Sequence, residues 1–154
     1  LANTLLATMR GIPQVFYGDE YAMKSADRRL GHSTLRMPLP LGEAVTEEMQ
    51  DMFDYQSRLF QWRKGEPVIH TGRTMHFMSR DNTYAFFRYN DSEAVFVFAN
   101  ASEENRTIPT ANYAEILSKY NAVGQDVITG KTYDLSRQDI VIPALTSIVV
   151  KLSK

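Results

Sequence analysis

Val95-Phe96-Val97-Phe98-Ala99 is the stretch that decides the fold of this 154-residue chain. All five side chains are apolar, so neither face of the segment is suited to water. β-Branched and aromatic residues favour an extended backbone, and a short apolar run without polar alternation is typical of a strand buried on both faces. We therefore predict that 93–100 is a central strand of a sheet.

Shorter segments on both sides of this strand are also predicted to be strands. They are rich in Val, Phe, Tyr and Thr, and turn-forming Gly, Asp, Asn and Ser separate them. Strands that recur every 8–12 residues or so are typical of an antiparallel sandwich. We expect a Greek-key-like β-sandwich with one helical turn over 112–119. The other expected strands are 68–70, 73–79, 83–90, 105–109, 126–128, 131–135, 139–142 and 145–152.

The first 65 residues follow a helical pattern instead. Apolar residues recur at helical spacing over 1–10 and again over 46–64, which predicts two helices. Thr46 is the expected N-cap of the second helix, and Gly65 is expected just after its end.

The segment between the two helices holds one expected strand and a long loop. Residues 12–17 are short and nearly all apolar, as in a strand buried on both faces, whereas 18–45 show no period. A loop of that length is usually functional. We assign the fold class α+β, with one part over 1–65 and an all-β part over 66–154. Because its strands alternate, the β part is expected to have a complete core of its own.

The composition excludes several classes of function. Seventeen basic and 18 acidic residues give a net charge of −1, which offers no basic footprint for nucleic acid or an anionic membrane. The absence of cysteine excludes disulfides and thiolate metal sites. No apolar run reaches the ~20 residues of a membrane span. The three histidines, His32, His70 and His76, show no metal-ligand spacing, so we expect no metal and no other cofactor.

One segment, 11–20, carries a resemblance to a known family. It reads Gly-Ile-Pro-Gln-Val-Phe-Tyr-Gly-Asp-Glu and matches the pattern Gly-x-Pro-x-x-x-Tyr-Gly-x-Glu of the α-amylase family of glycoside hydrolases. In that family the pattern forms the eighth strand of a (β/α)8 barrel and the start of the next loop. The tail from Pro67 resembles the β-sandwich that follows the barrel in neopullulanases and cyclomaltodextrinases.

The resemblance implies that the chain is the C-terminal fragment of a larger bacterial enzyme. Residues 1–65 would be an incomplete barrel end of two helices and one strand, because a whole barrel needs ~200–250 residues. The family's catalytic carboxylates stand at barrel strands four, five and seven, which would all precede residue 1. The fragment is therefore expected to hold no catalytic residue. The parent would hydrolyse α-glucosidic bonds in starch or maltodextrins with retention, in a periplasmic or extracellular rather than a cytoplasmic setting.

Tyr17, Asp19 and Glu20 are the candidates for the rim of the substrate site, because barrel sites form at the C-terminal ends of strands. Alternatively, Glu20 anchors the loop by hydrogen bonds while Asp19 is solvated. Two adjacent carboxylates on an extended chain point to opposite faces, so they cannot easily bracket one glycosidic bond. The partners expected are an α-glucan bound through the parent enzyme, the rest of the barrel, and a second copy of the chain.

A different class of function is a non-catalytic carbohydrate-binding module formed by the β part. Six aromatic residues could stack on sugar rings or could equally fill a core: Trp62, Tyr84, Tyr89, Tyr113, Tyr120 and Tyr133. Three Asn-x-Ser/Thr patterns, at Asn90, Asn100 and Asn105, fall at predicted turns, where asparagine is favoured for its conformation.

Overall fold

The computed structural model describes residues 1–24, 29 and 36–154. Most of the middle of the loop expected over 18–45, with His32, lies outside the described residues. The helices are α1 (Ala2–Thr8), η1 (Asp19–Tyr21), η3 (Gly42–Ala44), α2 (Glu47–Lys64), α3 (Pro67–Thr71), η4 (Thr110–Tyr113) and α4 (Ala114–Leu117). The strands are β1 (Arg73–His76), β2 (Thr83–Tyr89), β3 (Glu93–Asn100), β4 (Arg106–Thr107), β5 (Val123–Asp126), β6 (Thr132–Asp134), β7 (Val141–Ile142) and β8 (Thr146–Ser153).

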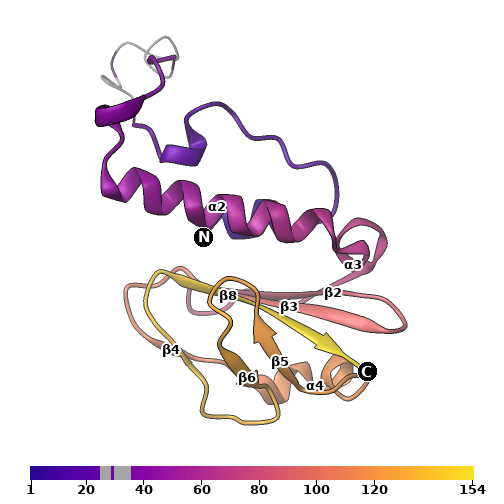
Figure 1. Ribbon diagram of the computed structural model, residues 1–154. Helices are drawn as coiled ribbons and strands as arrows, with labels where there is room; N and C mark the ends of the chain where they lie inside the picture. The colour runs from indigo at the N-terminus through magenta and orange to yellow at the C-terminus, as the bar shows by residue number, and fades with distance from the viewer. Residues whose placement is uncertain (25–28, 30–35) are drawn as a thin grey trace.

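The described elements form three layers, and the middle layer is one large sheet. Six strands pair antiparallel in the order β1-β2-β3-β8-β5-β6, and β4 pairs with β7 in a separate small sheet. Helices α1, α2 and α3 cover one face of the large sheet, whereas α4 and the small sheet cover the other (Figure 1). The order is not a plain meander, because β8, the last strand, lies between β3 and β5.

Strand β3 is central, as its sequence predicts. It pairs with β2 on one side and β8 on the other, and its residues from Ala94 to Asn100 are all buried. Val95 and Val97 pack under the helices, while Phe96 and Phe98 join the core on the opposite face. Each such side chain contributes about 1.5–3 kcal/mol when it is removed from water, so this strand fills both cores at once.

Both predicted helices are present, and α2 has the predicted ends. The Thr46 hydroxyl accepts a hydrogen bond from the backbone N–H of Met49 at 3.3 Å, and Gly65 follows the last helical residue. Helix α1 is only seven residues long and has no side-chain cap. A helix that short is marginal by itself, so its packing against α2 and the sheet must hold it.

The expected strand over 12–17 is wrong. These residues form no strand, and the Ile12 side chain is 98% exposed. The apolar run satisfies the pattern of a buried strand, but no described strand lies beside it to supply ladder hydrogen bonds. The described part of 1–65 thus contains both expected helices but not the expected strand.

Two expectations in the β part also need correction. Residues 68–70 lie in helix α3 rather than in a strand, because Pro67 stands at its N-terminus and the short apolar pair that follows suits either structure. The strand expected over 126–128 lies at 123–126 instead. The Asp126 carboxylate accepts hydrogen bonds from the N–H groups of Thr129 and Val149 at 3.0 and 2.8 Å, which turns the chain after that residue.

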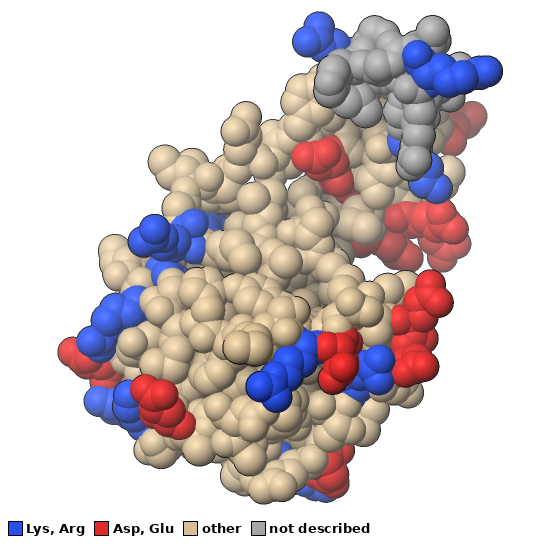
Figure 2. All heavy atoms as spheres, turned by 180° about the vertical axis from the view of Figure 1, so that it is seen from behind, with Lys and Arg blue, Asp and Glu red and all other residues tan. Residues whose placement is uncertain are grey.

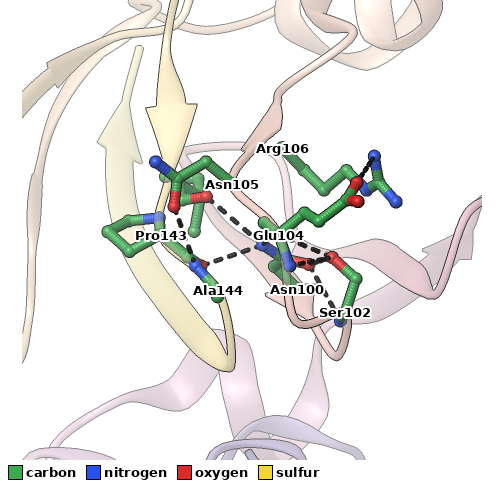
Figure 3. A network of polar contacts seen from close by, with 8 residues as sticks. Asn100, Ser102, Glu104, Asn105, Arg106, Pro143 and Ala144 are labelled. Atoms are coloured by element: carbon green, nitrogen blue, oxygen red, sulfur yellow. Dashed lines mark hydrogen bonds and ion pairs between the residues drawn. The ribbon is translucent and has the colours of Figure 1, made fainter.

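A buried asparagine joins two loops at one end of the sheet (Figure 3). The Asn100 amide donates to the carbonyls of Glu104 and Pro143 at 2.8 and 2.9 Å, and its oxygen accepts from the Ser102 hydroxyl at 2.7 Å. Asn100 has no exposed surface. The side chain therefore links the β3–β4 turn to the segment before β8 by hydrogen bonds. This role agrees with the conformational use expected of this asparagine.

The helical layer and the β part share one core. Ala7 and Leu59 pack with Val68, Phe86 and Val97, and all five are fully buried. The expectation that 67–154 has a complete core is wrong for this face of the sheet, because helices from the first 65 residues supply its cover.

Candidate functional site

The predicted rim residues lie in a tight turn after the extended segment 12–17. The N–H of Asp19 donates to the Phe16 carbonyl at 3.1 Å, and that of Tyr21 donates to the Gly18 carbonyl at 3.1 Å. Gly18 has φ +92°, and a Cβ there would lie 2.7 Å from the Met23 sulfur. The turn therefore favours glycine at this position for its backbone conformation, whereas the flexible Met23 side chain could move to make space.

Both carboxylates of the turn bind backbone N–H groups. Asp19 Oδ2 accepts from the N–H of Phe16 at 3.0 Å, and Glu20 Oε2 accepts from the N–H of Gly18 at 2.8 Å. Glu20 thus makes the anchoring hydrogen bond expected of it. Asp19 is exposed but also bonded, so it is not simply solvated. Each carboxylate keeps a second oxygen with no hydrogen bond to the described protein.

Aromatic contacts attach the turn to α2 and leave Tyr17 accessible. The Tyr21 ring stacks on Phe53 of α2, with 5.5 Å between ring centroids. Tyr17 is 41% exposed and lies beside the Phe16 ring, at 4.6 Å. An exposed tyrosine on a fixed turn can stack on a sugar ring, which is the chemistry that a rim position requires.

A hollow of about 550 Å³ lies between the turn, α1 and α2. Asp19 lines it together with Asn3, Met52 and Tyr55, whereas Tyr17 and Glu20 do not. The three candidates are therefore close in sequence but do not converge on one cavity. Asp19 is the one carboxylate among the described lining residues. A retaining glycosidase needs two carboxyl groups about 5–5.5 Å apart, and this hollow does not supply that pair.

Six exposed large apolar side chains lie on the loop segments before α2, and we name this set the apolar loop face. Exposed patches of this kind mark interaction surfaces when they are contiguous and large. The apolar loop face consists of Ile12, Val15, Phe16, Tyr17, Leu39 and Leu41.

The aromatic residues considered for sugar stacking are buried or half-buried. Tyr113 and Tyr133 are buried, at 5% and 9% exposure. The other four, Trp62, Tyr84, Tyr89 and Tyr120, are half-buried. Burial raises the pKa of Tyr113 to about 12, as expected of a phenol in an apolar core. None of the six presents an open aromatic platform.

The described residues hold no group of three or more His, Asp or Glu side chains arranged to bind a metal ion. Within the same part of the chain, no helix is long and apolar enough to cross a membrane. Acidic side chains gather near the start of α2 in the view from behind, while basic ones lie on the side where α2 meets α3 (Figure 2).

The sequence reasoning missed two buried arginines. Arg63, 6% exposed, donates to the carbonyls of Ala7 and Gly11 at 2.7 and 2.6 Å. Arg88, 1% exposed, donates to the Ile69 carbonyl at 2.7 Å and to the Thr74 hydroxyl. Burial lowers the pKa of both guanidinium groups. The available signal was the position of Arg88, a charged residue inside an otherwise apolar and aromatic strand.

Comparison with known families identifies the family to which the sequence of the β part is similar. Residues 74–151 match the family described as the cyclo-malto-dextrinase C-terminal domain, which is half of the chain. The chain belongs to this family. The matched range runs from β1 into β8 and contains most of the pairing between β3 and β8.

Several solved structures share the fold of the whole chain. An Anoxybacillus α-amylase superposes with TM-score 0.74 at 18% identity, covering 97% of this chain and 31% of that one. An α-amylase from Geobacillus thermoleovorans, complexed with acarbose, gives 0.71 at 19% identity, covering 99% and 32%. A Nostoc punctiforme debranching enzyme gives 0.67 at 20% identity, covering 99% and 28%. The chain thus spans about a third or less of the structures that it matches.

Proposed function

We propose that this chain is the C-terminal part of a retaining α-glucan hydrolase of the α-amylase family, of the neopullulanase or cyclomaltodextrinase kind. Residues 1–65 complete the end of its (β/α)8 barrel, and 66–154 form the β-domain that caps it. The observation that carries the proposal is membership of the cyclo-malto-dextrinase C-terminal domain family. The parent acts on starch or maltodextrins, and this part supplies scaffold rather than the catalytic pair.

The apolar loop face supports the barrel assignment of the N-terminal part. Ile12 is 98% exposed and Leu41 78% exposed, and no strand among the described residues pairs with the segment 12–17. Each large apolar side chain left in water forfeits about 1.5–3 kcal/mol relative to burial. An extended apolar segment with free backbone groups also invites pairing with another chain. In the parent, this face packs against the remaining barrel strands and helices.

In the same proposal, Tyr17, Asp19 and Glu20 lie at the substrate rim of the barrel. The exposed ring of Tyr17 and the free carboxylate oxygens of the turn suit contacts with sugar hydroxyls. The two carboxylates also brace the turn, so substrate contact and turn geometry depend on the same residues.

A hydrolysis assay tests the scaffold role. The isolated chain is incubated with soluble starch and with a nitrophenyl maltoside, and reducing ends and nitrophenol are followed. No turnover above the buffer rate is expected. Turnover that disappears in Asp19→Asn or Glu20→Gln would assign the catalytic pair to this chain and contradict the proposal.

Light scattering tests the proposed partner surface. We expect the isolated chain to self-associate as its concentration rises, and Ile12→Asp with Leu41→Asp to reduce association. Met78→Asp is the matched control, because Met78 is 81% exposed but lies in the β1–β2 loop, away from the apolar loop face. A monomeric wild type, or equal effects of the test and control variants, would refute this surface.

A further inference from the structure

A second hollow, of about 750 Å³, lies where α1 ends beside β1 and β2. Its size is within the ~300–1,000 Å³ that small-ligand sites occupy. Basic side chains dominate its polar lining: Arg10, Arg73, His76 and Arg88. None of the described residues that line it is acidic. The side chains of this hollow that can be charged near neutral pH are therefore all basic.

The buried positive charge of Arg88 has no acidic partner among the described residues. Arg88 is 1% exposed, yet its bonded partners are the neutral Ile69 carbonyl and Thr74 hydroxyl, and its Nε has no partner. The neighbouring Arg63 also binds neutral carbonyls. A buried charge without an opposite charge costs free energy that a counter-ion can offset.

The arginines around the hollow also repel one another. The charges of Arg63 and Arg10 add to burial in lowering the pKa of Arg88. Arg10 is exposed and makes no hydrogen bond or ion pair with any described residue. Arg73 lies over the Tyr89 ring at 4.9 Å and pairs with Asp91 at 2.9 Å, on an outer loop that does not line the hollow. Three guanidinium groups thus line the hollow. Those of Arg73 and Arg88 are held by bonded partners, and that of Arg10 is exposed.

We propose that this hollow is a binding site for an oxyanion, a phosphate or carboxylate group carried by a small ligand. Guanidinium groups match both anions, because their N–H donors form paired charge-assisted hydrogen bonds to two oxygens. Arg88 forms the fixed basic wall, and Arg10 and Arg73 close on the ligand from the surface. The site is independent of the proposed hydrolase role, since it shares no lining residue with the Asp19 hollow and uses none of the rim residues.

The test is an NMR titration of the isolated chain at constant ionic strength. Inorganic phosphate, acetate and neutral maltose are added separately, and the backbone amides of Gly72, Thr74 and Tyr89 are followed. Phosphate or acetate is expected to shift these signals to saturation, and maltose is not. The anion that binds more tightly identifies the group that the site takes.

Surface variants separate this site from general charge effects. Arg10→Gln and Arg73→Gln should each weaken anion binding about tenfold, the loss of one charge-assisted contact. Asp91→Asn should strengthen it about threefold, because it frees Arg73 from a surface ion pair. Arg80→Gln, an exposed arginine outside the hollow, should leave it unchanged. No saturable shift with either anion, equal shifts with maltose, or equal effects of Arg10→Gln and Arg80→Gln would overturn the proposal.

Discussion

Replacing Arg63 with methionine tests how the N-terminal segment is held on the rest of the protein. Arg63 lies in the last turn of α2, yet it donates to the carbonyls of Ala7, Met9 and Gly11 at 2.7, 3.1 and 2.6 Å. These carbonyls lie at the end of α1 and in the segment that follows it. A single side chain in the last turn of α2 therefore supplies donors to backbone carbonyls at and after the C-terminal end of α1.

The magnitude follows from the three bonds and their burial. A hydrogen bond to a charged group contributes about 1.5–3 kcal/mol, and a buried acceptor left without a donor costs about 1–3 kcal/mol. The Ala7 contact is buried, but the other two are part-buried and can return to water. Removing a buried charge also recovers desolvation free energy. We expect Arg63→Met to lower the free energy of unfolding by about 3 kcal/mol.

Urea unfolding measures the loss, and amide exchange locates it. Residues 2–11 should lose protection in Arg63→Met while β3 keeps it. Arg58→Met is the matched control, because Arg58 is an exposed arginine on the same helix whose carbonyl contacts, at 3.3 and 3.5 Å, are long. That control should change stability by less than about 0.5 kcal/mol. A loss under about 1 kcal/mol in Arg63→Met, with exchange over 2–11 unchanged, would refute this attachment.

Three further predictions follow from the fold. Gly18→Val should cost about 1–3 kcal/mol through its positive φ. Gly65→Ala, with ordinary space and φ, should be nearly neutral in the same urea assay. A chain limited to 45–154 should fold cooperatively because it keeps α2, whereas 67–154 should aggregate in light scattering because the sheet face under the helices keeps only α3 as cover. Absorbance near 295 nm should show one tyrosine, Tyr113, that ionises only at about pH 12. Since the folded protein keeps that proton while the unfolded chain loses it near pH 10, this group's contribution to stability is complete below pH 10 and is lost as the pH rises toward 12.

Sequence patterns sufficed where local signals and tertiary structure agree. The apolar run Val95–Ala99 predicts a strand covered on both faces, and the structure places a core on each side of it. The cap at Thr46 and the stop at Gly65 predict the ends of α2, because both act through contacts within a few residues.

The sequence-based predictions fail where residues far away in the sequence determine the local structure. Segment 12–17 has the composition of a strand but no described strand beside it to pair with. The β5 boundary depends on β8, since a Cβ at Gly124 would lie 2.1 Å from the Lys151 carbonyl oxygen. The roles of Arg63 and Arg88 were missed because their acceptors are 56 and 19 residues away at Ala7 and Ile69, separations at which no periodic signal exists. Within the candidate site, the sequence predicted the bracing of the turn by Glu20 but not the bond made by Asp19.

Hydrolysis by the full-length polypeptide that contains this chain is the measurement that decides whether the proposed parent enzyme exists. We expect a sequence upstream of Leu1 at least twice as long as this chain, in keeping with the 31% of the Anoxybacillus structure that the chain spans. Proton NMR of that polypeptide acting on maltoheptaose should show the α-anomer as the first product, because a retaining mechanism preserves the α-configuration. A much shorter upstream sequence, no hydrolysis by the folded full-length protein, or first appearance of the β-anomer would show that the chain is not part of a retaining α-glucan hydrolase.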